Sequence, residues 1–333
     1  MSETIRHENV VVFDDRGIPS IMVRIERPKT EVTPAMFILG TETADAIYIS
    51  KYPNKVIGGR AYSLPMVDPT VNINFDEAVQ ACRAKGKGWH LMTAVEWEYL
   101  LNESRQQDTL PHGNTNYGND YYHKEEHGEF PDRSRTVGRT LTGSGPATWN
   151  HDHTIYGVSD MCGNVWEWLA GLRIVDGVLE YIPNNNAALE DCDLSRDSKD
   201  WQQIITDAVD KDVVRVNVEH GEITITDKAA GEEYTPDYDG TPIKDLKVDL
   251  NHIPQVLRDL GIIPESRLGS EGKTYVWFDA TEGEYMPFRG SAFYNASHSG
   301  PSALHLDGVR SYSNDSVGFR SAFYEVNGKL ITE

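Results

Sequence analysis

The residues best suited to chemistry are histidines and acids in one polar stretch. Residues 123–129 read HKEEHGE, which spaces His123, His127 and Glu129 as in some metal sites, and residues 151–153 read HDH. On a helix, histidines four residues apart share a face and can bind one metal ion. Glycine and proline follow directly, which favours a loop. We therefore interpret both stretches as loop networks, with an iron site as the alternative.

Thiol chemistry has few candidates in this chain. Cys82, Cys162 and Cys192 are too few and too scattered for a disulfide framework or a paired-cysteine metal site. We expect small buried thiols, with Cys192 nearer the surface because its neighbours, LEDCDL, are acidic.

A second group of polar residues lies just before the last apolar segment. Tyr312, Asn314, Asp315 and Ser316 precede VGFRSAF, which begins at Val317 and is typical of a buried strand. Such residues form turns, because Asn, Asp and Ser bond their own backbone. They are also the residue types of a binding loop, in which Tyr supplies rigid contact area.

Composition excludes some functions. The 333 residues carry a net charge of −21, which excludes nucleic acid as the main partner. No apolar run is long enough to span a membrane, so we expect no membrane insertion. The first residues, MSETIRHENV, lack the basic and apolar regions of a secretory signal.

Periodicity predicts mixed secondary structure with long loops over residues 105–155. A helix from Asn74 and a second helix with a Thr93–Glu96 capping box are the clearest elements. Further helices are expected at 199–210 and 252–260, and strands are expected at 9–14, 20–25, 35–39, 46–50, 213–218 and 222–226.

Four stretches together resemble one known family. They read HLMTAVEWEYL, YGVSDMCGNVWEWLAG, FRGSAF and VGFRSAFY, and they begin at residues 90, 156, 288 and 317. They are similar to the formylglycine-generating-enzyme, or sulfatase-modifying-factor, type of C-type lectin fold. The resemblance implies a loop-rich α+β domain over residues 41–333, with a β-hairpin extension at 1–40 and an insertion at about 172–285.

The hexapeptide GNVWEW is the most specific of these signals. Gly163 permits a tight turn, Trp166 and Trp168 alternate onto one face of a strand, and Glu167 points to the other face. We expect Asn164 and Glu167 to form a structural hydrogen-bond network. A structural Ca²⁺ or Mg²⁺ ion bound near these two residues is the alternative.

Enzymes of this family need residues that the chain lacks. The copper oxidase uses paired cysteines in its C-terminal segment, and residues 288–324 contain none. The ergothioneine-type iron motif belongs to a helical-bundle domain that we do not find. We expect a protein that is not an enzyme and needs no cofactor. A degenerate nonheme-iron or copper oxidase is the alternative.

Residues 289–320 further resemble the variable region of diversity-generating-retroelement target proteins. In that family, Asn codons of a template are randomised at adenines. The invariant framework is matched by Arg289, Gly290, Phe293, Arg310, Gly318, Phe319 and Arg320. The variable, ligand-binding positions would be Ala292, Tyr294, Asn295, His298, His305, Asp307, Gly308, Tyr312, Asn314, Asp315 and Ser316.

The resemblance implies a binding protein that carries exchangeable residues on a rigid scaffold. Leu304 and Leu306 should point inward from a strand, while His305 and Asp307 point outward. The expected partner is a protein or glycan receptor, and the expected location is a phage tail or a bacterial surface. A homo-oligomer or a tail assembly is compatible with this. One alternative is that the expected variable residues are ordinary turn residues. Another is a structural virion protein whose subunits contact one another through residues 172–285.

Overall fold

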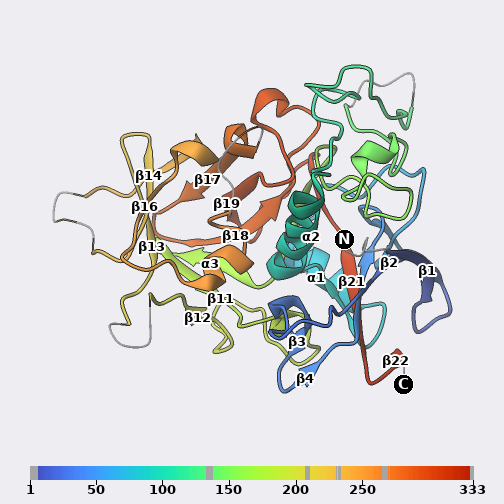
Figure 1. The fold of residues 1–333 in the computed structure, drawn as a ribbon, viewed down its shortest axis with the longest axis horizontal. Helices are drawn as coiled ribbons and strands as arrows, with labels where there is room; N and C mark the ends of the chain where they lie inside the picture. Colours follow the sequence, from blue (N-terminus) through green and yellow to red (C-terminus); the bar gives the residue numbers. More distant parts are fainter. Residues whose placement is uncertain are drawn as a thin grey trace.

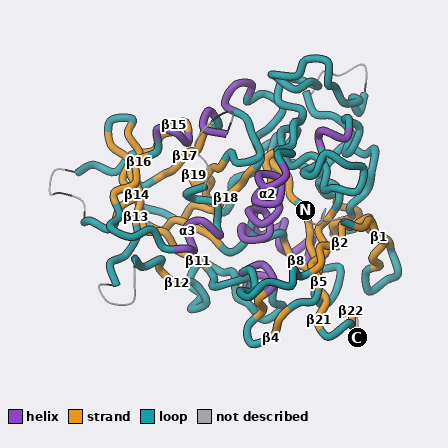
Figure 2. The backbone as a smooth tube through the Cα atoms, viewed as in Figure 1, coloured by secondary structure: helices purple, strands orange, loops and turns teal. Residues whose placement is uncertain are grey.

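Two β-sheets and two helices form the framework of the protein (Figure 1). The computed structural model describes residues 7–132, 138–206, 211–229, 231, 234–264, 269 and 271–330. Helix α2 lies between the sheets in the view of Figure 1, and Figure 2 shows how much of the chain is loop. The expected α+β, loop-rich fold class is confirmed.

The helices are α1 (Phe75–Arg83), α2 (Ala94–Gln107) and α3 (Gln255–Asp259). The first sheet contains β1 (Glu8–Phe13), β2 (Pro19–Glu26), β5 (Ala46–Ser50), β21 (Ser321–Val326) and β22 (Lys329–Leu330) in that order, with β8 (Trp89–Leu91) paired to β21. Two small hairpins are β3–β4 (Ile38–Leu39 and Glu42–Thr43) and β6–β7 (Lys55–Ile57 and Arg60–Tyr62).

The second sheet follows the order β15 (Tyr238–Pro242), β17 (Tyr275–Asp279), β19 (Leu304–Val309), β18 (Glu284–Arg289), β10 (Leu172–Val175), β11 (Val178–Tyr181), β13 (Arg215–Glu219), β14 (Glu222–Thr226) and β16 (Lys247–Asp249). Three further strands join this sheet: β12 (Gln202–Gln203) pairs with β11, β9 (Trp166–Trp168) with β18, and β20 (Val317–Phe319) with β9. Strands within 172–285 therefore belong to the same sheet as β18, β19 and β20.

The N-terminal hairpin is confirmed as β1 and β2, and β2 pairs with β5. The strand expected at 35–39 is wrong for its first part. Residues Ala35–Phe37 form a 3₁₀ turn that follows Pro34 and buries Met36 and Phe37. Only Ile38–Leu39 is extended.

The two long helices begin as their capping residues predict. The side chain of Asn74 accepts from the backbone of Glu77, and Thr93 accepts from Glu96, with the reciprocal bond present in both cases. Helix α2 is followed by Asp108 in the left-handed conformation.

The helix expected at 199–210 is wrong where the structure describes it, and residues 207–210 lie outside the described residues. Gln202–Gln203 is extended and pairs with β11, while Ile204 is buried and Ile205 is 39% exposed. The apolar residues that suggested a helix therefore belong to an extended segment that packs on the edge of a sheet. The helix expected at 252–260 is shorter, because it starts after Pro254.

All three cysteines are buried. Cys192 is the most exposed of the three, as expected, but only at 7%, because it packs in the same core cluster as Leu194 and Trp201. Burial raises the pKa of Cys192 to about 12 and raises that of Cys162 well above its usual value. None of the three thiols is therefore a ready nucleophile.

Across the residues that the structure describes, no helix combines the length and apolarity needed to span a membrane.

A buried ion pair joins the hexapeptide to the C-terminal segment. Arg320 donates from Nε to Glu167 Oε2 at 2.6 Å and from Nη2 to Glu167 Oε1, and both side chains are fully buried. The same guanidinium donates to the carbonyls of Ser50, Ser159 and Asp160. Burial raises the pKa of Glu167, and Arg320 opposes that shift.

Asn164 belongs to the neighbouring network. Its Oδ1 accepts from the Thr140 amide at 2.8 Å and from Asn114 at 3.2 Å, and its Nδ2 donates to the Thr140 carbonyl. Gly163 has φ of 74°, and a Cβ there would lie 2.2 Å from the Asn114 carbonyl oxygen. The hydrogen-bond network expected for Asn164 and Glu167 is present.

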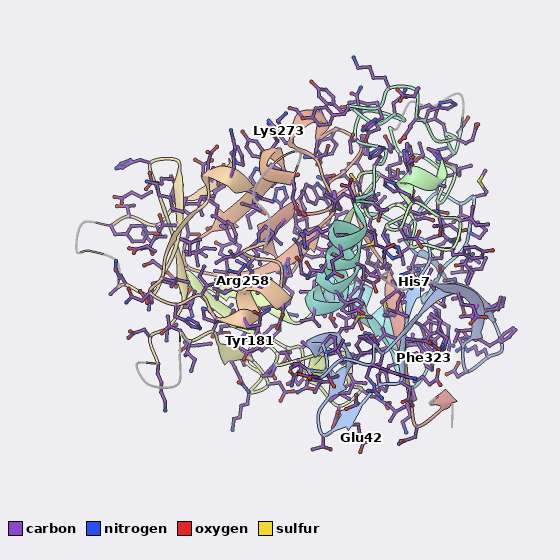
Figure 3. All side chains as sticks on the ribbon, viewed as in Figure 1. His7, Glu42, Tyr181, Arg258, Lys273 and Phe323 are labelled. Carbon is purple, nitrogen blue, oxygen red and sulfur yellow. The ribbon has the colours of Figure 1, made fainter. Side chains whose placement is uncertain are left out.

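The N-terminal segment is held by a second buried acid. Glu103 Oε2 lies 3.1 Å from His7 Nε2 and 3.8 Å from His151 Nε2. His7, labelled in Figure 3, thereby joins the N-terminal segment to α2. Burial alone would raise the pKa of Glu103, but the two histidines outweigh it and lower the pKa to about 2.

We expect Arg320→Met to lower the free energy of unfolding by about 3–5 kcal/mol, because Glu167 would be left buried without its cation. The double variant Arg320→Met with Glu167→Met should recover part of this loss. Chemical denaturation followed by tryptophan fluorescence measures both. A double variant as unstable as the sum of the two single variants would contradict the pairing.

We expect Glu103→Gln to lower stability at pH 7 by roughly 2–3 kcal/mol, following from the depressed pKa. A carboxylate with a lowered folded-state pKa stabilises the fold above its unfolded pKa of about 4.5, and this contribution is lost as pH falls towards 2. The difference between variant and parent should therefore shrink between pH 5 and pH 2, whereas the exposed control Glu8→Gln should show little change. A difference that stays constant with pH would refute this assignment.

Candidate functional site

The outer face of strands β17, β19 and β18, together with the loops beside them, forms the surface on which the residues expected to bind a ligand are placed. On β19, Leu304 and Leu306 are fully buried, whereas His305 and Asp307 face outward with side chains 17% and 22% exposed. The predicted alternation is thus present in the structure. Trp277 of β17 and Phe288 of β18 are the strand neighbours of His305 on either side.

Six rings form a continuous line across this face, which we call the aromatic row. In order, they are His298, Tyr275, Trp277, His305, Phe288 and Tyr312. Successive ring centroids lie 4.0, 5.4, 4.1, 4.9 and 6.0 Å apart. The tightest stack is His305 on Trp277, with an interplanar angle of 8°. Three expected variable residues, His298, His305 and Tyr312, therefore lie in one row with three rings from β17 and β18.

One end of the aromatic row borders a shallow concavity of about 150 Å³, which we call the aromatic groove. It is lined by Trp166, Phe288, Tyr294, His305, Asp307, Gly308, Tyr312, Ser316 and Val317. Tyr294 and Tyr312 are 43% and 38% exposed at its rim. Its walls are thus mostly aromatic, with a carboxylate and hydroxyl groups among them.

Hydrogen bonds fix the polar groups of the groove. His305 Nδ1 and Asp307 Oδ1 are 2.7 Å apart, and the Tyr294 hydroxyl lies 3.2 Å from Ser316 Oγ. Asn314 Nδ2 donates to the Tyr312 hydroxyl at 3.0 Å. The rim residues are therefore oriented before any ligand arrives, which lowers the entropy cost of binding.

The expected variable positions fall into three groups. Six line the aromatic groove: Tyr294, His305, Asp307, Gly308, Tyr312 and Ser316. Four others lie outside it, with His298 and Asp315 exposed and Asn295 and Asn314 half-buried. Of these four, His298 stacks on Tyr275 and Asn314 contacts Tyr312.

Ala292 is the exception, and its assignment as a ligand contact is wrong. It is fully buried in a core cluster with Phe293 and Trp166. Gly308 lines the groove but has no room for a side chain, because a Cβ there would lie 2.5 Å from the Phe288 ring. A larger residue at position 308 would have to displace that ring.

The expected framework residues hold this face from behind. Gly290, Phe293, Gly318 and Phe319 are buried. Arg289 donates to Glu98 at 3.0 Å and to the carbonyls of Gly261 and Ser302. Arg310 donates to Glu284 at 2.9 Å and to Asp76 at 2.7 Å.

Sequence reasoning missed the rings contributed by the sheet. Tyr275 and Trp277 lie within the expected insertion, and Phe288 directly precedes the expected variable region. The alternating pattern YVWFD over Tyr275–Asp279 would have predicted the strand, but not its parallel pairing with β19.

The histidine motif is a loop, as expected. His127 is exposed and its Nδ1 contacts the Glu125 carbonyl, whereas His123 stacks on His112 at 3.8 Å. The HDH stretch also makes loop hydrogen bonds, because His151 Nδ1 accepts from the Val158 amide and His153 Nε2 contacts the Leu110 carbonyl.

Comparison with known proteins identifies the family. Residues 30–200, slightly more than half of the chain, match the Sulfatase-modifying factor enzyme 1-like domain. No curated protein matches the chain.

Three solved structures are similar at low identity. PvdO from Pseudomonas aeruginosa is 15% identical with a TM-score of 0.40, and the alignment covers 97% of this chain and 100% of that one. The I1 and P3c variants of Major Tropism Determinant are 12% and 11% identical, with TM-scores of 0.34 and 0.35. These two alignments cover 92% and 96% of this chain and 56% and 62% of the variants. Likenesses this distant carry no functional information.

The family match shows the fold that the four sequence stretches led us to expect: the chain belongs to the sulfatase-modifying factor enzyme 1-like domain family.

Proposed function

We propose that this chain is a ligand-binding protein, and that its ligand is a protein or a glycan bound at the aromatic groove. One observation carries the proposal: six of the residues expected to vary surround a single accessible concavity. Most of the expected framework residues, in contrast, are buried behind the same sheet.

The chemistry of the groove suits such ligands. Aromatic ring faces bind apolar patches, including the C–H faces of sugars and the side chains of peptides. Asp307, Ser316 and the hydroxyls of Tyr294 and Tyr312 add polar groups that fix a ligand's orientation. Rigid tyrosines at the rim supply contact area at low entropic cost.

The second part of the proposal concerns the origin of these residues. A retroelement would diversify residues 289–320, and the protein would act on a phage tail or a bacterial surface. Support comes from the segregation of positions, since the exchangeable ones lie mostly on the outer face of β19 and its flanking loops. Apart from the buried Ala292, Gly308 and Ser316, these positions can change without disturbing the core.

We expect the combined substitution of Tyr294, His305 and Tyr312 by Ala to abolish ligand binding while the fold is retained. Binding should be screened with the unchanged protein on glycan arrays and on panels of bacterial cells, and the strongest hit then measured by titration. A loss of at least about 100-fold is expected for central aromatic contacts. Tyr156→Ala, at another exposed tyrosine (52%), is the matched control. Undiminished binding by the folded triple variant would refute the groove as the binding face.

The retroelement part has a separate test in the source genome. We expect a reverse transcriptase gene and an Asn-rich near-copy of the sequence that encodes residues 289–320 beside this gene. Absence of both would refute diversification, and it would leave ligand binding at the groove unaffected.

A further inference from the structure

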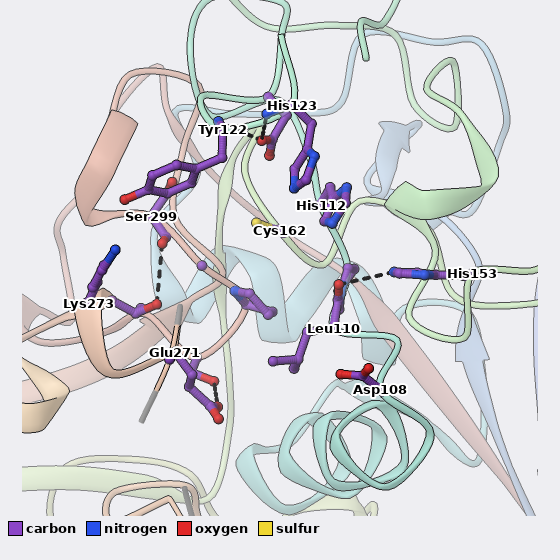
Figure 4. A pocket seen from close by; sticks show the side chains of 17 residues that line it. Asp108, Leu110, His112, Tyr122, His123, His153, Cys162, Glu271, Lys273 and Ser299 are labelled. Atoms are coloured by element: carbon purple, nitrogen blue, oxygen red, sulfur yellow. Dashed lines mark hydrogen bonds between the residues drawn. The ribbon is translucent and has the colours of Figure 1, made fainter. Parts of the chain in front are cut away.

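A second and larger cavity, of about 530 Å³, opens among the loops, and several histidines line it (Figure 4). Its described lining includes His112, His123 and His153, and we call it the histidine cavity. None of its described lining residues is shared with the aromatic groove. A ligand or ion in one site would therefore leave the other site accessible.

Three side chains at this cavity present metal-binding atoms close together. His112, His123 and Glu126 each offer one ligand atom, and these atoms all lie within 4.8 Å of one another. His112 Nδ1 lies 3.1 and 3.0 Å from the two carboxylate oxygens of Glu126. Two ligands of a tetrahedral zinc ion, each about 2.0–2.1 Å from the metal, are separated by about 3.3 Å. The observed separation is close to this value.

Surrounding hydrogen bonds hold the ligands in place. Glu126 accepts from Thr148 Oγ1 at 2.8 Å and from Trp149 Nε1 at 2.9 Å. Outer-shell bonds of this kind orient carboxylate ligands in metal sites.

The loops that carry the two histidines are tied together by Asp120. This buried carboxylate accepts from the backbone amides of Tyr122 and His123, both at 2.8 Å, and from the amide of Gly113 at 3.2 Å. Asp120 thus fixes the backbone at His123 and at Gly113, the residue that follows His112.

The other cluster of similar composition lacks the required tautomer. His7, Glu103 and His151 also bring their ligand atoms within 4.8 Å. His151 Nδ1 accepts from the Val158 amide at 2.8 Å, so the proton of a neutral His151 lies on Nε2 and points towards Glu103. That nitrogen has no lone pair to offer a metal, so this cluster acts as a buried electrostatic anchor of the N-terminal segment.

We propose that His112, His123 and Glu126 bind a divalent transition-metal ion such as Zn²⁺. Two imidazoles with one carboxylate favour zinc and related ions over Mg²⁺ and Ca²⁺, which prefer oxygen ligands. The ion replaces the proton between His112 Nδ1 and Glu126. Its fourth position faces the histidine cavity, where water or a ligand group completes the coordination.

One side chain has to move for this coordination. The rings of His112 and His123 are stacked with an interplanar angle of 7°, so their in-plane lone pairs run parallel. Among the described contacts, neither ring nitrogen of His123 has a hydrogen bond, so its ring turns about the Cα–Cβ bond without breaking one. The half-buried position of His123 leaves room for this rotation.

The test is zinc titration of untagged, full-length protein that has been dialysed against a chelator. We expect one equivalent of Zn²⁺ to bind, and we expect His112→Ala and His123→Ala each to weaken binding at least about 100-fold. Glu126→Gln should weaken it at least about 10-fold. His127→Ala is the matched control, because it removes an exposed histidine of the same loop and should change the affinity less than about 2-fold.

Several results would overturn the proposal. Equal losses in His127→Ala and His123→Ala would assign the metal to the HxxxH spacing, and a loss in Glu103→Gln alone would assign it to the buried anchor. Zinc displaced by equimolar Mg²⁺ would refute the ion class. Thermal unfolding without zinc serves as the folding control. If His112→Ala does not fold, the result for His123→Ala decides the test. The His123 side chain makes no described hydrogen bond, so its removal should leave the fold intact.

Discussion

The buried ion pair between Glu167 and Arg320 is the interaction on which the rest of the structure depends. It joins a strand from the middle of the chain to the segment that follows β20, and both charged groups are fully buried. Removing one partner would strand a charge in the interior, which is far more costly than losing a surface pair. The GNVWEW and GFR stretches are therefore physically one unit.

The position of the outer face follows from that unit. Strand β9 pairs with β18 on one side and β20 on the other, so Trp166 and Trp168 pack beneath Phe288 while Glu167 faces Arg320. Because β18 pairs with β19, the position of β18 fixes the side of the sheet to which His305 and Asp307 point. The pleat then separates core residues from exposed ones along a single strand.

Local patterns in the sequence predicted individual helices and strands, but they did not predict which distant strands pair with each other. The capping boxes at Asn74 and Thr93 and the alternation along Leu304–Asp307 are encoded within a few residues, and all were correct. The parallel pairing of β17 with β19 depends on contacts between residues almost thirty positions apart, so the aromatic row could not be predicted. The helical spacing in 199–206 failed because a sheet edge buried Ile204 instead.

The candidate site shows the same division between local and long-range information. The resemblance of residues 289–320 predicted which positions are exchangeable, but only tertiary packing shows that Ala292 is enclosed and that Phe288 fills the space beside Gly308. In the same way, the HKEEHGE stretch suggested that His123 and His127 could bind one metal ion. In the structure, Asp120 instead holds the loop so that His123 stacks on His112.

The distribution of charge adds a constraint on the proposed ligand binding. The chain carries 52 acidic and 31 basic residues, and several of its arginines are directed inward. Arg289, Arg310 and Arg320 are each paired with a glutamate that is itself buried: Glu98, Glu284 and Glu167. Their positive charge is used to fix the scaffold and contributes little to the surface. Under the proposed function, binding at the aromatic groove would rely on ring stacking and short-range hydrogen bonds, which tolerate exchange of individual residues better than a matched array of charges does.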